Sequence, residues 1–261
     1  MVAIIALLLG ILLPSLSKAR EVARDSASLS NMRQVGAVAM ANFLVEERGR
    51  FPWHSSEIPS GSRPNGNKPR WADYIYPMIN NTKVFVNPHL SLEESVLSKK
   101  FWHETAEEDA LWAGENPNAS FTAKTEPADG WSLWGGYGYN YQYLGNARSG
   151  FQFRRNQNTV THNSVTVVIG DTNGQGSDPT DGTYVLDPPD GSLAGSGDGK
   201  YYHGSAAADR SAPYARGGNT GEFVFADGHA ESMTPDEIDR RQSDDSTDHY
   251  HWNGYGDPAQ R

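Results

Sequence analysis

The opening run of the chain, Met1 to Leu16, carries no charged side chain and is almost entirely aliphatic. It passes directly into a segment with helical spacing of apolar and charged residues, and the only break signal is Pro14. We therefore predict one helix from Ala3 to about Glu47. At ~1.5 Å per residue this helix would be roughly 67 Å long. A helix of that length with a bare apolar end has to place that end outside water.

Three interpretations of the apolar run are open. A secretory signal peptide would begin with basic residues, and none is present; the small-residue cleavage site after the run is also poor. A buried core helix would show an apolar stripe, whereas here leucine and isoleucine occupy every face. A membrane anchor is favoured, because the uncharged stretch before Lys18 has 17 residues, close to the ~20 that span a bilayer core.

The second half of the predicted helix is amphipathic. Its apolar residues recur at helical spacing and form one stripe, made of Met32, Val35, Gly36, Ala39, Met40 and Phe43. Arg33, Gln34 and Asn42 face the other way. The stripe predicts packing on a sheet of the same chain. Pro14 predicts a kink, and the Arg48-Gly49 pair predicts the end of the helix.

The body carries three β signals. In Gly135–Gly145 four tyrosines alternate with small or polar residues, which predicts one strand with four rings on one face: Tyr137, Tyr139, Tyr141 and Tyr143. Such a stripe can stack sugars, but a half-buried strand packed against the helix is the favoured interpretation. A buried strand is expected within Val160–Asp171. Gly221–Met233 predicts a hairpin with a type I′ turn at Asp227-Gly228.

The remaining helical signals are short. Trp71–Ile79 and Ser91–Trp102 predict helical pieces, and the acidic segment from His103 to Glu115 could extend the second of them. Thr234-Pro235-Asp236-Glu237 is a capping sequence that predicts a helix to about Arg241. The polar tail after it could dock back through Trp252 and Tyr255.

Together these signals predict an α+β fold in which the long helix packs on an antiparallel sheet with long loop insertions. We divide the chain into an N-terminal helix with a membrane anchor (1–50), a globular body (51–233) and a short helix with a polar tail (234–261).

Charge and composition exclude several classes of function. Residues 1–50 carry six basic and four acidic residues, so residues 51–261 hold a net charge of −12 within a total of −10. So acidic a body repels phosphate backbones, which argues against nucleic-acid binding. The absence of cysteine excludes disulfides and thiolate chemistry.

Catalytic motifs are also missing. The sequence has neither a Gly-x-Ser-x-Gly nor a His-Glu-x-x-His motif. His203, Asp227 and His229 could be imagined as a hydrolytic or metal site, and Asp248, His249 and His251 as a loose metal site in the tail, but we favour an unreactive role for each. We therefore predict that the protein is not an enzyme.

One loop has the composition of a calcium site. Residues 171–199 hold six Asp and seven Gly and no Lys or Arg, and calcium prefers hard oxygen ligands on flexible loops. The candidate ligands are Asp171, Asn173, Asp178 and Asp181. No bidentate glutamate follows as in an EF-hand. Calcium and a solvated acidic loop both remain open, and the solvated loop is favoured.

The N-terminal helix carries a family resemblance. The run from Ile4 to Gly36 closely resembles the N-terminal helix of type IV pilin-like proteins, especially the large pseudopilin-like proteins with a prepilin-type N-terminal methylation domain. The family has a proline at the place of Pro14 and a small-Lys-Ala-Arg-Glu run at the place of Ser17 to Glu21. The family also begins with a basic leader, a Gly-Phe cleavage site and a glutamate. None of these is present, so we expect that residues before Met1 are missing or that processing is lost.

A second resemblance lies in the predicted hairpin. Large pseudopilin-like proteins share a C-terminal His-x9-Asp-Gly signature, often followed by His, and Asp227-Gly228-His229 is similar to its end. Ten residues before Asp227 the chain has Gly217, and the nearest upstream histidine is His203. The loop therefore either carries an insertion or has lost the histidine.

The resemblance implies a non-catalytic subunit of a type II secretion or type IV pilus-like assembly. Its partners would be other pilin-like subunits, contacted through the N-terminal helix, and secretion-system components. The protein would cross the inner membrane once, with its body in the periplasm or outside the cell. Lys18, Arg20 and Arg24 by themselves would favour a cytoplasmic body, and here we follow the family. The major pseudopilins hold calcium in a C-terminal loop, which supports the calcium hypothesis by analogy. The alternative is an anchored surface protein that binds carbohydrate or calcium without polymerising.

Overall fold

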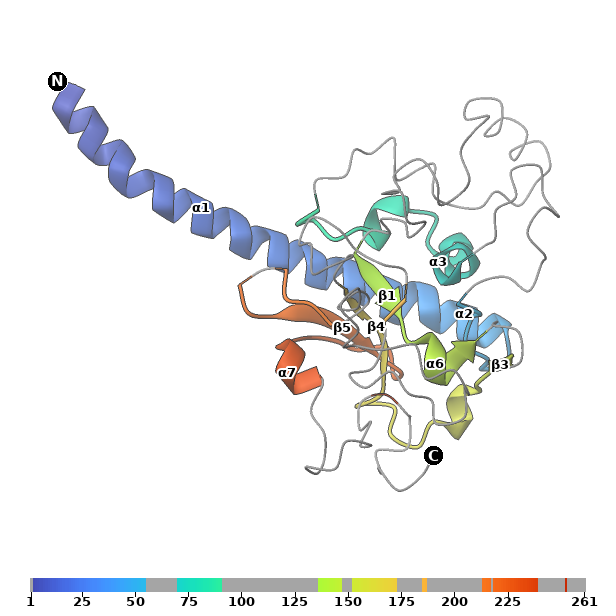
Figure 1. Ribbon diagram of the computed structural model, residues 1–261. Coiled ribbons are helices and arrows are strands. Elements are labelled where there is room, and N and C mark those ends of the chain that lie inside the picture. Colours follow the sequence, from blue (N-terminus) through green and yellow to red (C-terminus); the bar gives the residue numbers. More distant parts are fainter. Residues whose placement is uncertain are drawn as a thin grey trace, which may run out of the picture.

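The computed structural model describes residues 2–54, 70–90, 136–146, 152–172, 185–186, 213–216, 218–238 and 252. Among them, one long helix and a four-stranded antiparallel sheet form the body of the molecule (Figure 1). The predicted helical piece at Ser91–Trp102, its extension through His103–Glu115, and Tyr255 all lie outside the described residues. The α+β class is confirmed.

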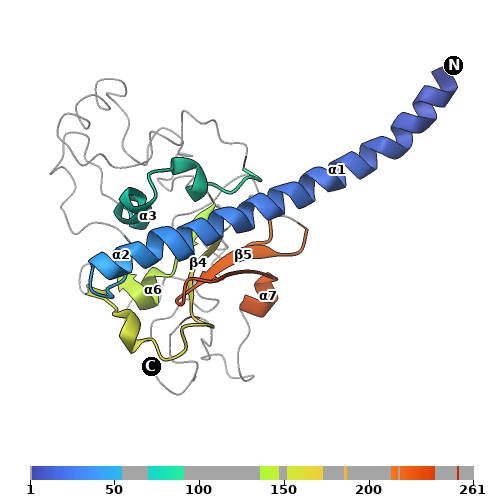
Figure 2. The same cartoon turned by 180° about the vertical axis from the view of Figure 1, so that it is seen from behind.

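The N-terminal helix is continuous, as its sequence predicts. It consists of α1 (Val2–Arg33), a π-helical stretch η1 (Gln34–Met40) and α2 (Ala41–Glu46). Pro14 lies inside α1, and α1 curves towards its N-terminal end (Figures 1 and 2).

The helix ends where Arg48 and Gly49 both adopt positive φ, 55° and 83°. The Gly49 amide donates to the Leu44 carbonyl at 2.6 Å, which closes the last turn.

The sheet has the strand order β1-β4-β5-β6, and every neighbouring pair is antiparallel. The strands are β1 (Tyr137–Tyr139), β4 (Val167–Asp171), β5 (Gly221–Phe225) and β6 (Ala230–Met233). Tyr139 pairs with Ile169, and Val224 pairs with Ala230. A bulge between Val167 and Ile169 shifts the register of β4 on β5.

Both faces of this sheet are covered. The predicted helical stripe is buried, and it joins the main core with Tyr139, Val168 and Val224. The alternate residues of β5, Phe223 and Phe225, belong to a second core on the other face, which includes Val167, Leu186, Ile238 and Trp252. In both views the sheet lies between the long helix and α7 (Pro235–Ile238) (Figures 1 and 2).

Smaller elements surround this core. They are α3 (Trp71–Ile75), η2 (Tyr76–Met78) and η3 (Thr82–Phe85), then α6 (Tyr141–Leu144) and η4 (Gln157–Thr159), and a two-stranded sheet of β2 (Gly145–Asn146) and β3 (Phe153–Arg154). The elements α3 and η2 confirm the helical prediction for Trp71–Ile79. Arg154 of β3 ties the sheet to the helix end, because it donates to Glu47 at 2.8 Å and to the Phe51 carbonyl at 2.6 Å.

The prediction of one tyrosine strand through Gly135–Gly145 is wrong beyond Tyr139. The chain turns at Asn140, and Tyr141 and Tyr143 lie on α6. The Asn140 side-chain amide donates to the carbonyls of Val167 and Trp252, at 2.9 and 3.1 Å. These distant partners hold the turn that ends the strand.

The predicted hairpin is confirmed, but the predicted type I′ turn is wrong. Gly228 has φ 91°, whereas Asp227 does not have positive φ. The Gly228 amide donates to the Phe225 carbonyl, and the Phe225 amide donates to the His229 carbonyl, both at 2.9 Å. This is the three-residue loop in which a glycine in the left-handed region follows an ordinary turn.

The predicted capping box at α7 is confirmed. The Glu237 amide donates to the Thr234 hydroxyl at 3.2 Å, and the Thr234 amide donates to the Glu237 carboxylate at 2.8 Å. Behind this helix Trp252 is buried and donates through its indole nitrogen to the Ile238 carbonyl at 3.3 Å. The prediction that Trp252 docks back is therefore confirmed.

Thr234→Ala should lower the free energy of unfolding by about 0.5–2 kcal/mol, because the substitution removes the capping oxygen. Urea unfolding followed by tryptophan fluorescence measures the change. Thr234→Ser is the control, since it keeps the hydroxyl and should remain close to the unchanged protein. Equal losses in both variants would contradict the capping role.

Candidate functional site

The apolar third of α1 is the most unusual surface of the described protein. Its large aliphatic side chains are between 51% and 68% exposed: Ile4, Ile5, Leu7, Leu8, Leu9, Ile11, Leu12, Leu13 and Leu16. This end of the helix extends away from the sheet (Figure 1). The long helix is the one described helix that is long and apolar enough to cross a membrane. Its exposed aliphatic side chains would be costly in water and stable in a bilayer or against neighbouring helices.

The helix joins the body over a short polar section. The amide of Gly218 donates to the Glu21 carboxylate at 3.0 Å, and Asp25 pairs with the His89 ring nitrogen at 2.7 Å. One turn further on, the Ser28 hydroxyl lies 2.9 Å from the Tyr137 hydroxyl. The side chains of the helix are therefore exposed up to Leu16, and by Ser28 the helix packs against the body.

Asp171, one of the four candidate calcium ligands, is buried at the end of β4 with 1% of its surface exposed. Its two carboxylate oxygens accept from the Asn87 side chain at 2.6 Å and from the Glu222 amide at 2.9 Å. Burial raises the pKa of the Asp171 carboxyl to about 7, while the Arg216 guanidinium and these hydrogen bonds oppose the rise. The carboxyl thus has a structural role in joining the sheet to the segment at Asn87.

The other candidate ligands, Asn173, Asp178 and Asp181, lie outside the described residues. Within the described part of the chain no group of three or more His, Asp or Glu side chains could hold a metal ion.

The polar network around Asp171 is a feature that the sequence analysis missed. The Asn87 side chain bridges Asp171 and Ser28, with a distance of 3.4 Å to the Ser28 hydroxyl. Burial also raises the pKa of the Tyr137 hydroxyl well above its ordinary value. Asn87 lies just after η3, 59 and 84 residues from its partners in the sequence, so no local pattern indicates the network.

The buried Asp171 carboxyl should make stability fall as the pH rises. Its pKa is about 7 in the folded protein and near 3.8 in the unfolded chain. The folded state therefore binds an extra proton between these values, and this stabilisation is full below pH 3.8 and is lost as the pH rises through about 7. The expected slope is up to ~1.4 kcal/mol per pH unit.

Asp171→Asn tests this dependence, because it keeps an acceptor for Asn87 but cannot ionise. The unfolding midpoint is measured in urea at pH 5 and at pH 8 for both proteins. From pH 5 to pH 8 the unfolding midpoint of the unchanged protein should fall more than that of the variant. A difference independent of pH would contradict the raised pKa.

The signature residues of the hairpin lie together at its turn. The Asp227 carboxylate lies 2.5 Å from the His229 ring nitrogen Nδ1 and accepts from the His229 amide at 3.1 Å. The His229 ring stacks on Phe225, with 4.5 Å between centroids. Gly228 abuts the long helix, since a Cβ at Gly36 would lie 3.0 Å from the Gly228 carbonyl oxygen. These contacts give Asp227, Gly228 and His229 a structural role, and His203 lies outside the described residues.

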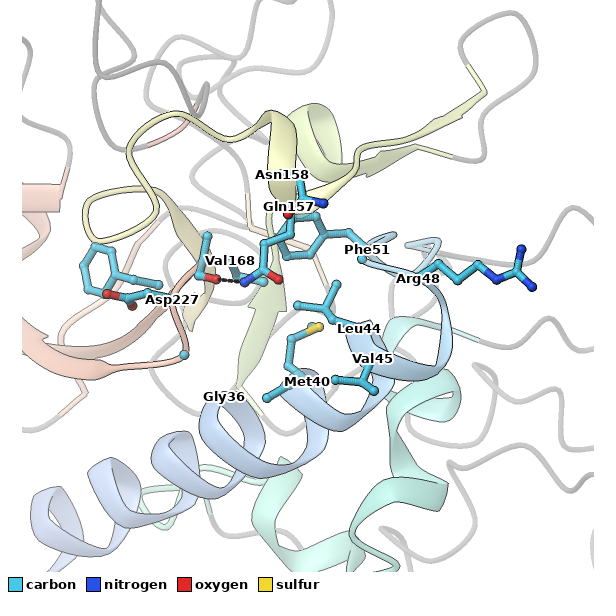
Figure 3. Close-up of a pocket in the computed structure, with 15 residues that line it drawn as sticks. Gly36, Met40, Leu44, Val45, Arg48, Phe51, Gln157, Asn158, Val168 and Asp227 are labelled. Carbon is cyan, nitrogen blue, oxygen red and sulfur yellow. Dashed lines mark hydrogen bonds between the residues drawn. The ribbon is translucent and has the colours of Figure 1, made fainter.

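A cavity of about 390 Å³ lies between the helix end and this hairpin turn. Figure 3 shows Met40 and Leu44 pointing from the helix towards Phe51 and Gln157. The Gln157 side chain donates to the Ala226 carbonyl at 2.8 Å across it. Aliphatic and aromatic side chains make up much of its wall, and Arg48 and Asp227 are its two charged lining residues.

Comparison of the chain with protein-family models, with curated proteins and with solved structures finds no match.

Proposed function

We propose that this protein is a membrane-anchored, pilin-like structural subunit of the pseudopilin kind, which assembles through its N-terminal helix and performs no catalysis. The observation that carries the proposal is a single helix that is bare and aliphatic at one end and packed on an antiparallel sheet at the other. The resemblance of Ile4–Gly36 to the pilin-like helix supports it.

The mechanism follows from burial of apolar surface. In the membrane the aliphatic third of α1 lies among lipid chains. On assembly the same side chains pack against helices of neighbouring subunits, so they stay out of water in both states. The body, which carries the negative charge of the chain, remains in the aqueous phase and selects partners.

The proposed setting is the inner membrane of a secretion or pilus-like system, crossed once, with the body in the periplasm or outside the cell. Neighbouring pilin-like subunits and secretion-system components are the proposed partners.

Co-purification of two differently tagged copies tests self-assembly. Both copies are produced in one cell, the membranes are solubilised in a mild detergent, and one tag is captured. Assembly predicts that the second tag is recovered from membranes that contain both copies, and that it is not recovered when membranes with one copy each are mixed after solubilisation. Recovery of the captured tag without the second tag would contradict assembly. It would favour an anchored surface protein that does not polymerise.

A further inference from the structure

A second site lies where the apolar third of α1 meets its first charged residues. A shallow groove of about 520 Å³ is lined by Leu13, Leu16, Ser17, Arg20, Glu21, Arg24 and His89. It combines aliphatic side chains at one end with two guanidinium groups at the other. Neither feature is used by the packing of the helix on the sheet.

The two arginines of the groove continue a row of side chains that begins with Leu16. Leu16, Arg20 and Arg24 follow each other at intervals of four residues, so they lie above one another on one helix face. Within the described part of the chain no carboxylate pairs with Arg20 or Arg24. The neighbouring acidic side chains are already engaged, Glu21 by the Gly218 amide and Asp25 by His89.

The depth of this row matches the headgroup layer of a bilayer. Arg20 lies one turn beyond Leu16, ~6 Å along the helix axis, and the headgroup layer is roughly 5–7 Å thick on each side of the hydrocarbon core. If the aliphatic third is embedded, Arg20 therefore lies in the headgroup layer. Arg24 lies ~12 Å beyond Leu16, and because helical side chains point back towards the N-terminus, its long side chain extends towards the same layer. Guanidinium groups bind phosphate oxygens in a bidentate manner.

We infer that the groove formed by Leu13, Leu16, Arg20, Arg24 and His89 binds the headgroup of an anionic phospholipid. Arg20 and Arg24 hold the phosphate, and Leu13 and Leu16 lie beside the first part of the acyl chains. His89, fixed by Asp25, forms the wall on the side of the body. The inference rests on the proposed function, because it requires the aliphatic third of α1 to be in a membrane.

The experiment uses the full chain, reconstituted by detergent removal into vesicles of phosphatidylcholine with or without phosphatidylglycerol. Incorporation into vesicles of phosphatidylcholine alone, followed by flotation, tests the anchor. Lipid retained after transfer to a neutral detergent, measured by native mass spectrometry, tests the site. Inorganic phosphate is added as a competitor to distinguish a lipid headgroup from free phosphate.

The unchanged protein should retain phosphatidylglycerol in preference to phosphatidylcholine. Arg20→Gln with Arg24→Gln should weaken this retention about thirtyfold, since each basic side chain near an anionic surface contributes roughly a factor of five. Lys18→Gln is the matched control, because Lys18 lies two residues from Arg20 and therefore on the opposite side of the helix. It should keep the preference.

Three results would overturn the site while leaving the anchor intact. The first is equal retention of both lipids by an incorporated protein. The second is a loss with Lys18→Gln as large as with the double arginine variant. The third is displacement of phosphatidylglycerol by inorganic phosphate. Failure to incorporate into any vesicle would contradict the anchor itself, and the site with it.

Discussion

Leu8→Arg with Leu12→Arg should move the protein from the membrane fraction to the soluble fraction. Both side chains lie near the middle of the aliphatic third and are more than half exposed. An arginine near the centre of a membrane-spanning helix costs about 2.5–3.5 kcal/mol, so two of them should lower partition into the bilayer by roughly four orders of magnitude. Ultracentrifugation of cell membranes, followed by carbonate extraction and immunoblotting, measures the distribution.

The matched control places the same two charges further along the helix. Asn42 and Val45 lie on its exposed side, and Val45 is 81% exposed. Asn42→Arg with Val45→Arg should leave the protein in the membrane fraction. If both double variants stayed with the membrane after carbonate extraction, the aliphatic third would not be the anchor.

Gly36→Ala should destabilise the body, although alanine is the better helix former. A Cβ at Gly36 would lie 2.5 Å from a methyl carbon of Val224 and 3.0 Å from the Gly228 carbonyl oxygen. Val224 is fully buried, short and β-branched, so it has little room to move. Overpacking of this kind costs about 1–3 kcal/mol, and it would push the helix away from the hairpin turn.

Gly10→Ala is the control, because it makes the same chemical change on the same helix with nothing within 4 Å of the new Cβ. It should leave the free energy of unfolding of the body unchanged. Urea unfolding of the full chain in detergent, followed by tryptophan fluorescence, compares the two. A neutral Gly36→Ala would mean that the helix does not approach the sheet as closely as described.

Local patterns in the sequence predict the elements whose structure depends on nearby residues. The helix from Ala3 to Glu46, its buried stripe and the capping box at Thr234 follow from spacing within one or two turns. The hairpin follows from alternation in β5 and from the Asp227-Gly228 pair. In each case the residues that decide the structure are neighbours in the chain.

The features that the sequence predicts wrongly, or does not predict at all, involve distant partners or backbone detail. The tyrosine strand ends at Tyr139 because Asn140 donates to Val167 and Trp252, which lie 27 and 112 residues away. The link from Ser28 through Asn87 to Asp171 is equally non-local, with separations of 59 and 84 residues. The turn type depended on the φ of one residue, Asp227. None of these can be deduced from the spacing of residue types.

For the candidate site, the sequence shows the apolar helix and its cations but not their surroundings. The aliphatic run and the spacing of Leu16, Arg20 and Arg24 can be deduced directly. His89 as the wall of the groove cannot, because its contact with Asp25 joins segments 64 residues apart.

Position-specific cross-linking tests most directly whether copies assemble through their apolar helices. The chain has no cysteine, so Leu9→Cys, in the aliphatic third, and Asn42→Cys, on the exposed side of α2, each provide a single thiol. Membranes containing either variant are treated with a short bis-maleimide and separated by denaturing electrophoresis. Assembly through the apolar helices predicts efficient dimer formation through Cys at position 9 and little through position 42. Absence of the dimer at position 9, in a protein that remains in the membrane, would contradict the proposed assembly.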